Sequence, residues 1–535
     1  MHRPAAISGL GPLPTEVGHG ESPPTVPALL ARSAREFGEL TYLVSPTDRL
    51  TYAEAEQRSA EVARWLLAEG VGKGSRVGLF FTNGVEWVIW WLAASRIGAV
   101  VVPLSTMYKP AELAKVLRLA DVGLLVAPSK VLDIDVAGRF EAALPELSGQ
   151  QAGRLALQAA PYLRGVVLTG DSDRSWVTHV DVAAGCVPRE VLAAVEAEVS
   201  PADLAIMVHT SGSTADPKGV LHTHGTLVRQ TSTWPAAIRA VTGSDESARI
   251  LCAMPFFWIG GVLAAMGALH EPVTLLVMPR LDAVTALDLV ERERATGLVG
   301  WPAFTQRLRD HSSFGSRDLS SAPMLCDGPL DIAMTDVPDG FPVHRTMSET
   351  AGGFAYTELA VVDEHGDPVP DGTVGELLIR GIGVMAGYNK RERSETFDEA
   401  GWYHTSDRVY RRTNDPRLFY VGRTSELIKT SGANVSPLEV EAVVEGLPDV
   451  AQCVVVGIAD AQRGEAVCAV VVPAAAELDV SSVVARIRDQ LSDYKVPTQW
   501  LLATSEQIPT LSSGKLNRKA LQELVISGAL AAVPD

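Results

Sequence analysis

Cysteine is scarce in this sequence of 535 residues, which has five: Cys186, Cys252, Cys326, Cys453 and Cys468. No two of them are close enough to form a Cys-x-x-Cys metal or redox site. Their odd number and irregular spacing also argue against a disulfide framework. We therefore expect free thiols in a reducing compartment, which favours a cytoplasmic location.

Positive charge is also in short supply. The chain has 46 Lys and Arg against 64 Asp and Glu, a formal net charge of −18. This balance argues against non-specific binding to nucleic acid or to an anionic membrane surface, because both require an excess of basic residues. A small anionic substrate is still allowed, since a local pocket can be basic in an acidic protein.

Long hydrophobic runs are absent. The apolar stretch 87–102 is interrupted by Ser95 and Arg96, and no run has the length that a membrane span requires. The first residues lack the basic stretch followed by an apolar one that marks a signal peptide. We expect neither a membrane segment nor a secretion signal.

The chain is too long for one hydrophobic core, so two or more domains are expected. Residues 1–25 are rich in Gly and Pro and are expected to form a loose arm. Further on, hydrophobic periodicity predicts helices at 53–69 and 86–96, and strands at 76–81 and 99–103. Such alternation predicts a parallel sheet covered by helices. Near the C-terminus the pattern predicts strands at 450–457 and 466–473 and a helix at 480–491.

One polar loop has the composition of an anion-binding site. Residues 210–219 read Thr-Ser-Gly-Ser-Thr-Ala-Asp-Pro-Lys-Gly, after an apolar strand-like run at 204–208. Backbone N–H groups near Gly212 can curl around an anion, and hydroxyl groups and Lys218 can add donors and charge. The lysine is not followed by Ser or Thr, so the loop is no Walker A motif. It suits a polyphosphate, although a polar surface turn is the ordinary alternative for such a composition.

The loop resembles the phosphate loop of the adenylate-forming (ANL) superfamily, which includes acyl-CoA and aryl-CoA synthetases, adenylation domains and firefly-type luciferases. Ala215 stands where that pattern has a glycine. Further segments match in the expected order over nearly the whole chain. The resemblance implies an α/β fold, with a large N-terminal domain of stacked sheets and covering helices and a small mobile α+β C-terminal domain. After the arm 1–25, the expected boundaries are 26–423 for the large ATP- and substrate-binding domain and 424–535 for the small domain.

The resemblance also implies site residues. Those expected to bind ATP or AMP are Thr210, Ser211, Gly212, Ser213, Thr214, Ala322, Arg345, Thr346, Asp407 and Arg423. Those expected to act in catalysis are Lys218, Glu349 and Lys515, and Glu349 is also the expected magnesium ligand. A carboxylate beside phosphates repels them, so a hard cation is needed between the two. Ser425 corresponds to the pivot of the hinge between the domains, where a rotation would withdraw Lys515 and bring the face near Gly432 to the site.

Three features depart from the family pattern. Arg345 replaces the aromatic residue that usually stacks on adenine, and the connection from Glu349 to Gly375 is short by roughly 20 residues, well outside ordinary loop variation. Trp258 stands where many members have histidine, in a segment that supplies the expected substrate-pocket residues Phe257, Trp258 and Gly260. An apolar aromatic run is more often core than pocket wall, and the family match favours the pocket. An indole wall favours an aromatic or otherwise unsaturated acid over a long saturated one.

The expected function is an ATP-dependent acid–thiol ligase. It would activate a carboxylic acid as an acyl adenylate with release of pyrophosphate, and pass the acyl group to a thiol. ATP, Mg²⁺ and coenzyme A are the expected cofactors, and a small-molecule acid is the expected partner. Three alternatives stay open: activation of another oxyanion, such as nitrite for diazotisation of an aryl amine; loading of a carrier protein; and a non-catalytic nucleotide-binding relative. A homodimer is also possible.

Overall fold

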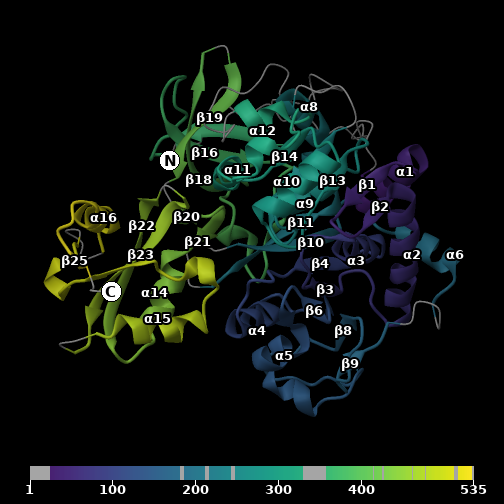
Figure 1. Ribbon diagram of the computed structural model, residues 1–535, viewed down its shortest axis with the longest axis horizontal. Coiled ribbons are helices and arrows are strands. Elements are labelled where there is room, and N and C mark those ends of the chain that lie inside the picture. Colours follow the sequence, from purple (N-terminus) through teal and green to yellow (C-terminus); the bar gives the residue numbers. More distant parts are fainter. Residues whose placement is uncertain are drawn as a thin grey trace.

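The structure is a computed structural model that describes residues 24–180, 186–210, 216–242, 248–328, 357–413, 415–423, 427–460, 462–475, 478–510 and 516–532. A large N-terminal domain of stacked sheets and a smaller C-terminal domain lie side by side (Figure 1). The α/β class and the division into a large and a small domain, both expected from the sequence, are confirmed by the sheets and the helices that cover them. None of the described helices is long and apolar enough to cross a membrane.

The central sheet of the large domain has eight strands in the order β17-β11-β10-β4-β3-β5-β8-β9. Their bounds are β3 Arg76–Leu79, β4 Val100–Pro103, β5 Leu124–Pro128, β8 Gly165–Thr169, β9 Val177–Thr178, β10 Leu204–Thr210, β11 Lys218–Thr223 and β17 Gly387–Tyr388. The strands from β10 to β9 pair in parallel, whereas β11 returns antiparallel to β10. The predicted parallel sheet is therefore present, with a hairpin at one edge.

A second sheet has five strands in the order β14-β12-β13-β1-β2. Their bounds are β1 Thr41–Val44, β2 Arg49–Thr51, β12 Arg249–Cys252, β13 Thr274–Leu276 and β14 Gly297–Val299. One continuous apolar cluster contains residues from both sheets and from the helices between them. These helices are α1 Val26–Phe37, α2 Tyr52–Ala68, α3 Val85–Arg96, α7 His224–Thr231, α8 Trp234–Thr242 and α9 Ile259–Gly267. Every residue of α3 except Glu86 is buried, as expected for a helix that is apolar on all sides.

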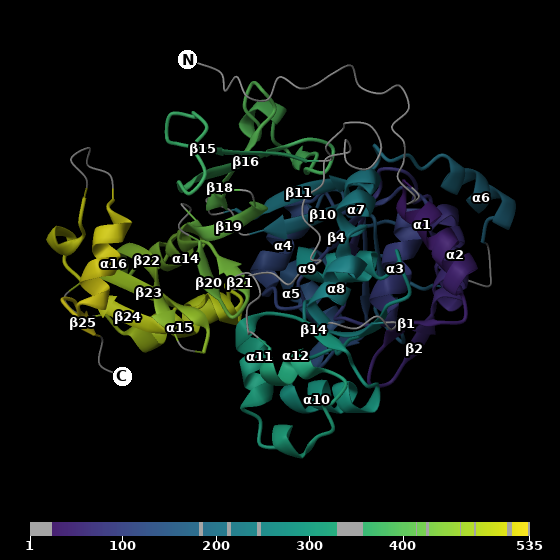
Figure 2. The same ribbon diagram turned by 90° about the horizontal axis from the view of Figure 1, so that it is seen from above.

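The outer faces of the two sheets are covered as well. Helices α4 Pro110–Leu119 and α5 Val136–Ala143 pack on the other face of the central sheet. Helices α10 Ala283–Arg292, α11 Pro302–Arg309 and α12 Pro323–Asp327 pack on the other face of the second sheet. Helix α6 Arg189–Ala197 lies at the periphery (Figure 2).

A third, antiparallel sheet completes the large domain in the order β15-β16-β18-β19. Its strands are β15 Glu358–Val362, β16 Gly375–Arg380, β18 Tyr403–Arg412 and β19 Asp415–Arg423. The glycine-rich segment that leads into β17 begins at Gly381, which has φ 126°, and ends at Gly387, the first residue of β17, which has φ 149°.

The small domain is built on one sheet in the order β21-β20-β23-β24-β25, with β22 also paired to β23. Its strands are β20 Ile428–Thr430, β21 Ala433–Val435, β22 Val450–Asp460, β23 Gly464–Pro473, β24 Gln499–Leu502 and β25 Ala531–Ala532. Successive valines of β22 and β23 alternate between two apolar clusters, as the period of a strand dictates. The covering helices are α14 Pro437–Glu445, α15 Val480–Arg488 and α16 Arg518–Ile526. Helix α15 ends three residues before the predicted end, because Asp489 is its C-cap.

Candidate active site

The polar loop is carried by the β10–β11 hairpin. Thr210 ends β10 and Lys218 begins β11, and the two residues are paired across the ladder. The loop between them holds Ser211, Gly212, Ser213 and Thr214, which lie outside the described residues. Lys218 Nζ lies 5.2 Å from the centroid of the Tyr388 ring, and Tyr388 pairs with the same strand from β17. Thr210 and Lys218 thus lie together at the loop end of the hairpin. The ammonium group of Lys218 lies over the aromatic face of Tyr388.

Asp407 and Arg423 lie directly opposite each other in the β18–β19 ladder. The preceding Ser406 adopts φ 63°, and the Asp407 N–H donates a hydrogen bond to Thr405 Oγ1 at 3.0 Å. The register therefore places the backbone positions of Asp407 and Arg423 together in the third sheet.

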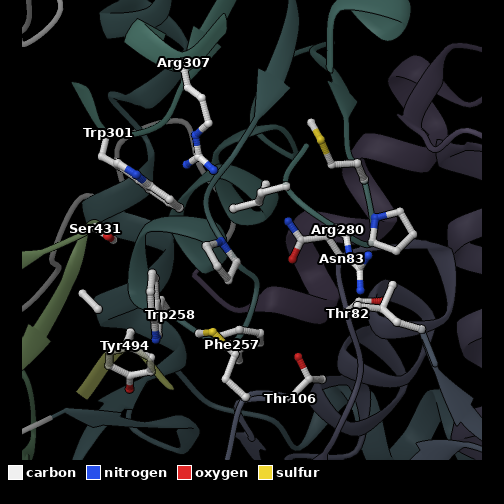
Figure 3. A pocket seen from close by; sticks show the side chains of 17 residues that line it. Thr82, Asn83, Thr106, Phe257, Trp258, Arg280, Trp301, Arg307, Ser431 and Tyr494 are labelled. Atoms are coloured by element: carbon white, nitrogen blue, oxygen red, sulfur yellow. The ribbon is translucent and has the colours of Figure 1, made fainter. Parts of the chain in front are cut away.

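A cavity of about 300 Å³ opens between the large domain and the small domain (Figure 3). The large domain contributes Phe257, Trp258, Trp301 and two arginines, Arg280 and Arg307. The small domain contributes Ser431, Ala433 and Tyr494. Tyr494 and Ser431 lie on the side opposite Arg280 (Figure 3). The cavity is mainly apolar and aromatic, with cationic groups that could hold an anionic end of a ligand.

A second cavity, of about 180 Å³, lies at the hairpin. Its lining includes His209 and Thr210 from β10 and Pro217, which directly precedes β11. The small domain contributes Asn434. Trp258, Ala433 and Tyr494 line both cavities, whereas Phe257 lines the first and Gly260 the second. Trp258 therefore lies between the two cavities, and the three residues expected in the substrate pocket are brought together at this point.

An aromatic wall was only partly predicted by the sequence. The Trp258 ring lies edge-on to Phe257 at 5.7 Å and tilted to Trp301 at 6.3 Å. Trp301 was missed, although a tryptophan just before Pro302, the first residue of α11, is a usable signal. Its Nε1 is buried and has no hydrogen-bond partner in the described part of the chain. The backbone of Gly432, at φ 82°, lies against this indole, so close that an added Cβ would be 2.6 Å from Trp301 Cδ2.

His209 is a second residue at the site that no sequence motif marks. Burial, aided by the positive charge of Arg76, lowers the pKa of His209 to about 4. Its imidazole is therefore neutral at pH 7, and its Nδ1 has no hydrogen-bond partner among the residues that the structure describes. The sequence signal was its position, directly before Thr210 in a buried strand.

The other predicted residues are placed less completely. Ala322 is buried just before α12, where its side chain joins the apolar cluster on the outer face of the second sheet. Arg345, Thr346, Glu349, Ser425 and Lys515 lie outside the described residues, as does part of the short connection after Glu349. In the described ranges, no cluster of three or more His, Cys, Asp or Glu side chains forms a metal site, so the magnesium prediction depends on Glu349 alone.

The segments that flank Lys515 are placed. Thr510 and Leu516 form an isolated bridge, and α16 follows at the end of the small domain farthest from the large one (Figures 1 and 2). The β20–β21 hairpin, in contrast, lies at both cavities through Ala433. In this orientation the small domain presents its hairpin to the site.

Comparisons with known proteins agree with this architecture. The family model described as AMP-binding enzyme matches residues 30–336, and that of the AMP-binding enzyme C-terminal domain matches 439–515. A methyl-dioxo-octahydroindenyl-propanoyl:CoA ligase of Mycobacterium tuberculosis is 31% identical over 94% of this chain and 99% of its own length. A feruloyl-CoA synthase of Amycolatopsis is 30% identical, over 91% of this chain and 96% of the relative.

Solved structures give the same result. The amide bond synthetase McbA from Marinactinospora thermotolerans superposes with a TM-score of 0.73 at 25% identity, covering 92% of this chain and 99% of that one. The o-succinylbenzoate CoA synthetase of Bacillus subtilis gives a TM-score of 0.67 at 21% identity, over 92% and 98% of the two chains, which shows the shared fold. The chain thus belongs to the AMP-binding enzyme family, and so to the adenylate-forming superfamily that its motifs resemble.

Proposed function

We propose that this protein is an ATP-dependent, AMP-forming acid–CoA ligase. The observation that carries the proposal is the pair of cavities that share Trp258, one at the phosphate hairpin and one lined by Arg280 and Arg307. Relatives named for joining CoA to ferulic acid and to indoleacetic acid support it. They favour this reaction over nitrite activation, carrier-protein loading and a non-catalytic role.

The first step overcomes the poor reactivity of a carboxylate, whose leaving group would be oxide. Attack of the carboxylate oxygen on the α-phosphorus of ATP forms the acyl adenylate, and pyrophosphate leaves. Negative charge gathers on the phosphate oxygens during this step, so cations and N–H donors must surround them. The loop at 211–215 would supply donors, and Lys218 and Lys515 would supply charge.

The nucleotide would be held by residues from several segments. Asp407 would accept hydrogen bonds from the ribose hydroxyls, with Arg423 opposite it in the ladder. Arg345, Thr346 and Ala322 would lie along the base and the sugar. Glu349 would hold Mg²⁺, which neutralises phosphate charge when it is bound.

The second step needs a thiol to reach the acyl carbon. The 300 Å³ cavity has Trp258 and Tyr494 on one side and Arg280 on the opposite side, while Arg307 lies near Trp301 (Figure 3). CoA carries its thiol on a long arm and its phosphates at the opposite end, which fits this polarity, because arginine binds phosphate well. The thiolate would attack the acyl carbon, and AMP would leave.

The domain boundaries belong to the same proposal. We place the large domain at 26–423 and the small domain at 424–535, after an arm at 1–25, with Ser425 as the pivot between them. A cytoplasmic location and assembly as a homodimer stay predictions, and a carrier protein is the alternative acceptor that the relatives do not favour.

A panel assay tests the proposal. Purified protein with ATP and Mg²⁺ should release pyrophosphate in the presence of one class of carboxylic acid, and added CoA should yield the acyl-CoA, identified by mass. Nitrite with an aryl amine serves as the competing substrate pair. Pyrophosphate release that requires nitrite, or a product formed with a carrier protein but not with CoA, would overturn the assignment.

A further inference from the structure

The large and small domains are joined by a buried ionic cluster. Lys495 of the small domain, in the 3₁₀ turn Asp493–Lys495, places Nζ 2.6 Å from Glu112 Oε1 of α4 in the large domain. The same Nζ lies 2.7 Å from Glu439 Oε1 of α14, in its own domain. The three side chains are only 6%, 9% and 12% exposed for Lys495, Glu112 and Glu439. We call Glu112, Glu439 and Lys495 the interdomain clasp.

The clasp is well supplied with hydrogen bonds. Glu112 Oε1 accepts a hydrogen bond from Lys495 Nζ. Glu112 Oε2 accepts hydrogen bonds from the Ser492 hydroxyl at 2.6 Å and from the Lys109 N–H at 2.9 Å. Ser492 belongs to the small domain and is fully buried against α4. Both carboxylate oxygens of Glu112 therefore have hydrogen-bond donors. Removing one partner of such a buried ion pair is strongly destabilising, because it leaves an uncompensated buried charge.

The charges of the clasp depend on one another. Burial alone would lower the pKa of Lys495, but the neighbouring Tyr494, Glu439 and Glu112 raise it above its ordinary value. Burial raises the pKa of Glu439, against the opposing effect of Lys495. The ammonium therefore stays charged at neutral pH, and removal of Glu112 would leave it with a single carboxylate.

This cluster fixes one orientation of the small domain. With the clasp closed, Gly432 packs on Trp301 and the β20–β21 hairpin lines both cavities. The segments on both sides of Lys515 then lie at the far end of the small domain (Figure 2). A lysine needed at the phosphates can arrive only if the small domain turns, and turning separates Lys495 from Glu112.

We propose that Glu112 and Lys495 are positioning residues for acyl transfer to the thiol, and that the clasp opens for acid activation. The inference rests on the proposed function. It predicts that the two half-reactions respond differently to one buried contact between the domains, made by Glu112, which lines neither cavity, with Lys495, which lines the second.

The decisive variant is Glu112→Gln. Glutamine keeps the size and can still accept the N–H of Lys109 at the start of α4, so the helix is retained while the buried ion pair is lost. Transfer from a preformed adenylate to CoA should slow by roughly ten- to a hundred-fold. This is less than the loss of a sole buried partner would cause, because Glu439 still pairs with Lys495. The rate of acid-dependent pyrophosphate exchange into ATP should stay within about two-fold of wild type. This assay reports adenylate formation, whereas Glu112 is proposed to act only in acyl transfer.

A neighbouring pair provides the matched control. Lys109 Nζ and Asp493 Oδ1 also join the two domains, at 3.0 Å, but the Asp493 side chain is 83% exposed. An exposed ion pair contributes little, so Asp493→Asn should leave both half-reactions at the wild-type rate. Lys495→Met should reproduce the transfer defect from the small-domain side, and the double variant with Glu112→Gln should be less impaired than the product of the two single effects.

The outcomes separate this inference from the function on which it rests. A wild-type protein that makes no acyl-CoA refutes the function. An active wild type whose Glu112→Gln variant loses both half-reactions equally, or neither, refutes the clasp alone. A lowered melting temperature with equal loss in both steps also counts against it, since that is what a merely structural ion pair would give.

Discussion

Replacing Trp258 by histidine tests whether the indole between the two cavities selects the acid. Trp258 lines both cavities and lies against Phe257 and Trp301. An indole offers a planar acid a large stacking face, which histidine cannot match. We expect the Trp258→His variant to lose catalytic efficiency for aromatic or unsaturated acids while its use of ATP changes little.

The size of the effect follows from two terms. An aromatic contact is worth on the order of 1 kcal/mol beyond burial. Losing about 50 Å² of apolar contact costs about a further 1.3 kcal/mol. Together they amount to about 2 kcal/mol, or roughly a 20- to 50-fold fall in kcat/KM for a planar acid.

The assay is acid-dependent pyrophosphate exchange over a series of planar and saturated acids, with KM for ATP measured in parallel. Tyr162→His serves as the control, because Tyr162 is 58% exposed and lines neither of the two cavities. Equal losses for planar and saturated acids, or a loss confined to ATP, would refute the reasoning. So would a wild-type preference for long saturated acids.

The remaining predictions concern the phosphates and the buried histidines. Lys515→Ala should slow adenylate formation by about 10²-fold or more with ATP binding retained in equilibrium titrations; an unchanged rate would remove Lys515 from the site. Glu349→Gln should raise the Mg²⁺ concentration needed for half-maximal activity, and an unchanged requirement would contradict its role as a ligand. Burial lowers the pKa of His209, His224 and His270 from 6.5 to about 4, so only the unfolded chain binds their protons between these values. Stability should therefore fall as pH drops from 6.5 toward 4, by about 1.4 kcal/mol per pH unit for each histidine, and a melting temperature that does not change between pH 7 and 5 would contradict this.

Local pattern sufficed for the main elements of the fold. The helix expected at 53–69 is α2, and that at 86–96 is α3. The strand predicted at 99–103 is β4, paired in parallel with β3. These segments were predictable because burial of a helix stripe or a strand face imposes a period on the sequence itself.

Contacts between distant segments could not be read in this way. Trp301 and His209 contribute to the site through burial against other elements, and neither belongs to a periodic signal or a motif. The clasp joins position 112 to position 495, and nothing local to either residue marks it. A lysine in a short polar turn is ordinarily a solvated residue, so only the docked small domain reveals that Lys495 is buried.

The contact between Gly432 and Trp301 also bears on how fast the enzyme can cycle. A glycine has no side-chain rotamers to freeze when it meets a surface, and the indole offers a flat face that needs no matching groove. When the Gly432 backbone packs on the Trp301 ring, little side-chain conformational entropy is lost. When this contact breaks, no interdigitated side chain at Gly432 has to be withdrawn. Under the proposed rotation of the small domain, such a contact suits a surface that is reached and left once in every turnover.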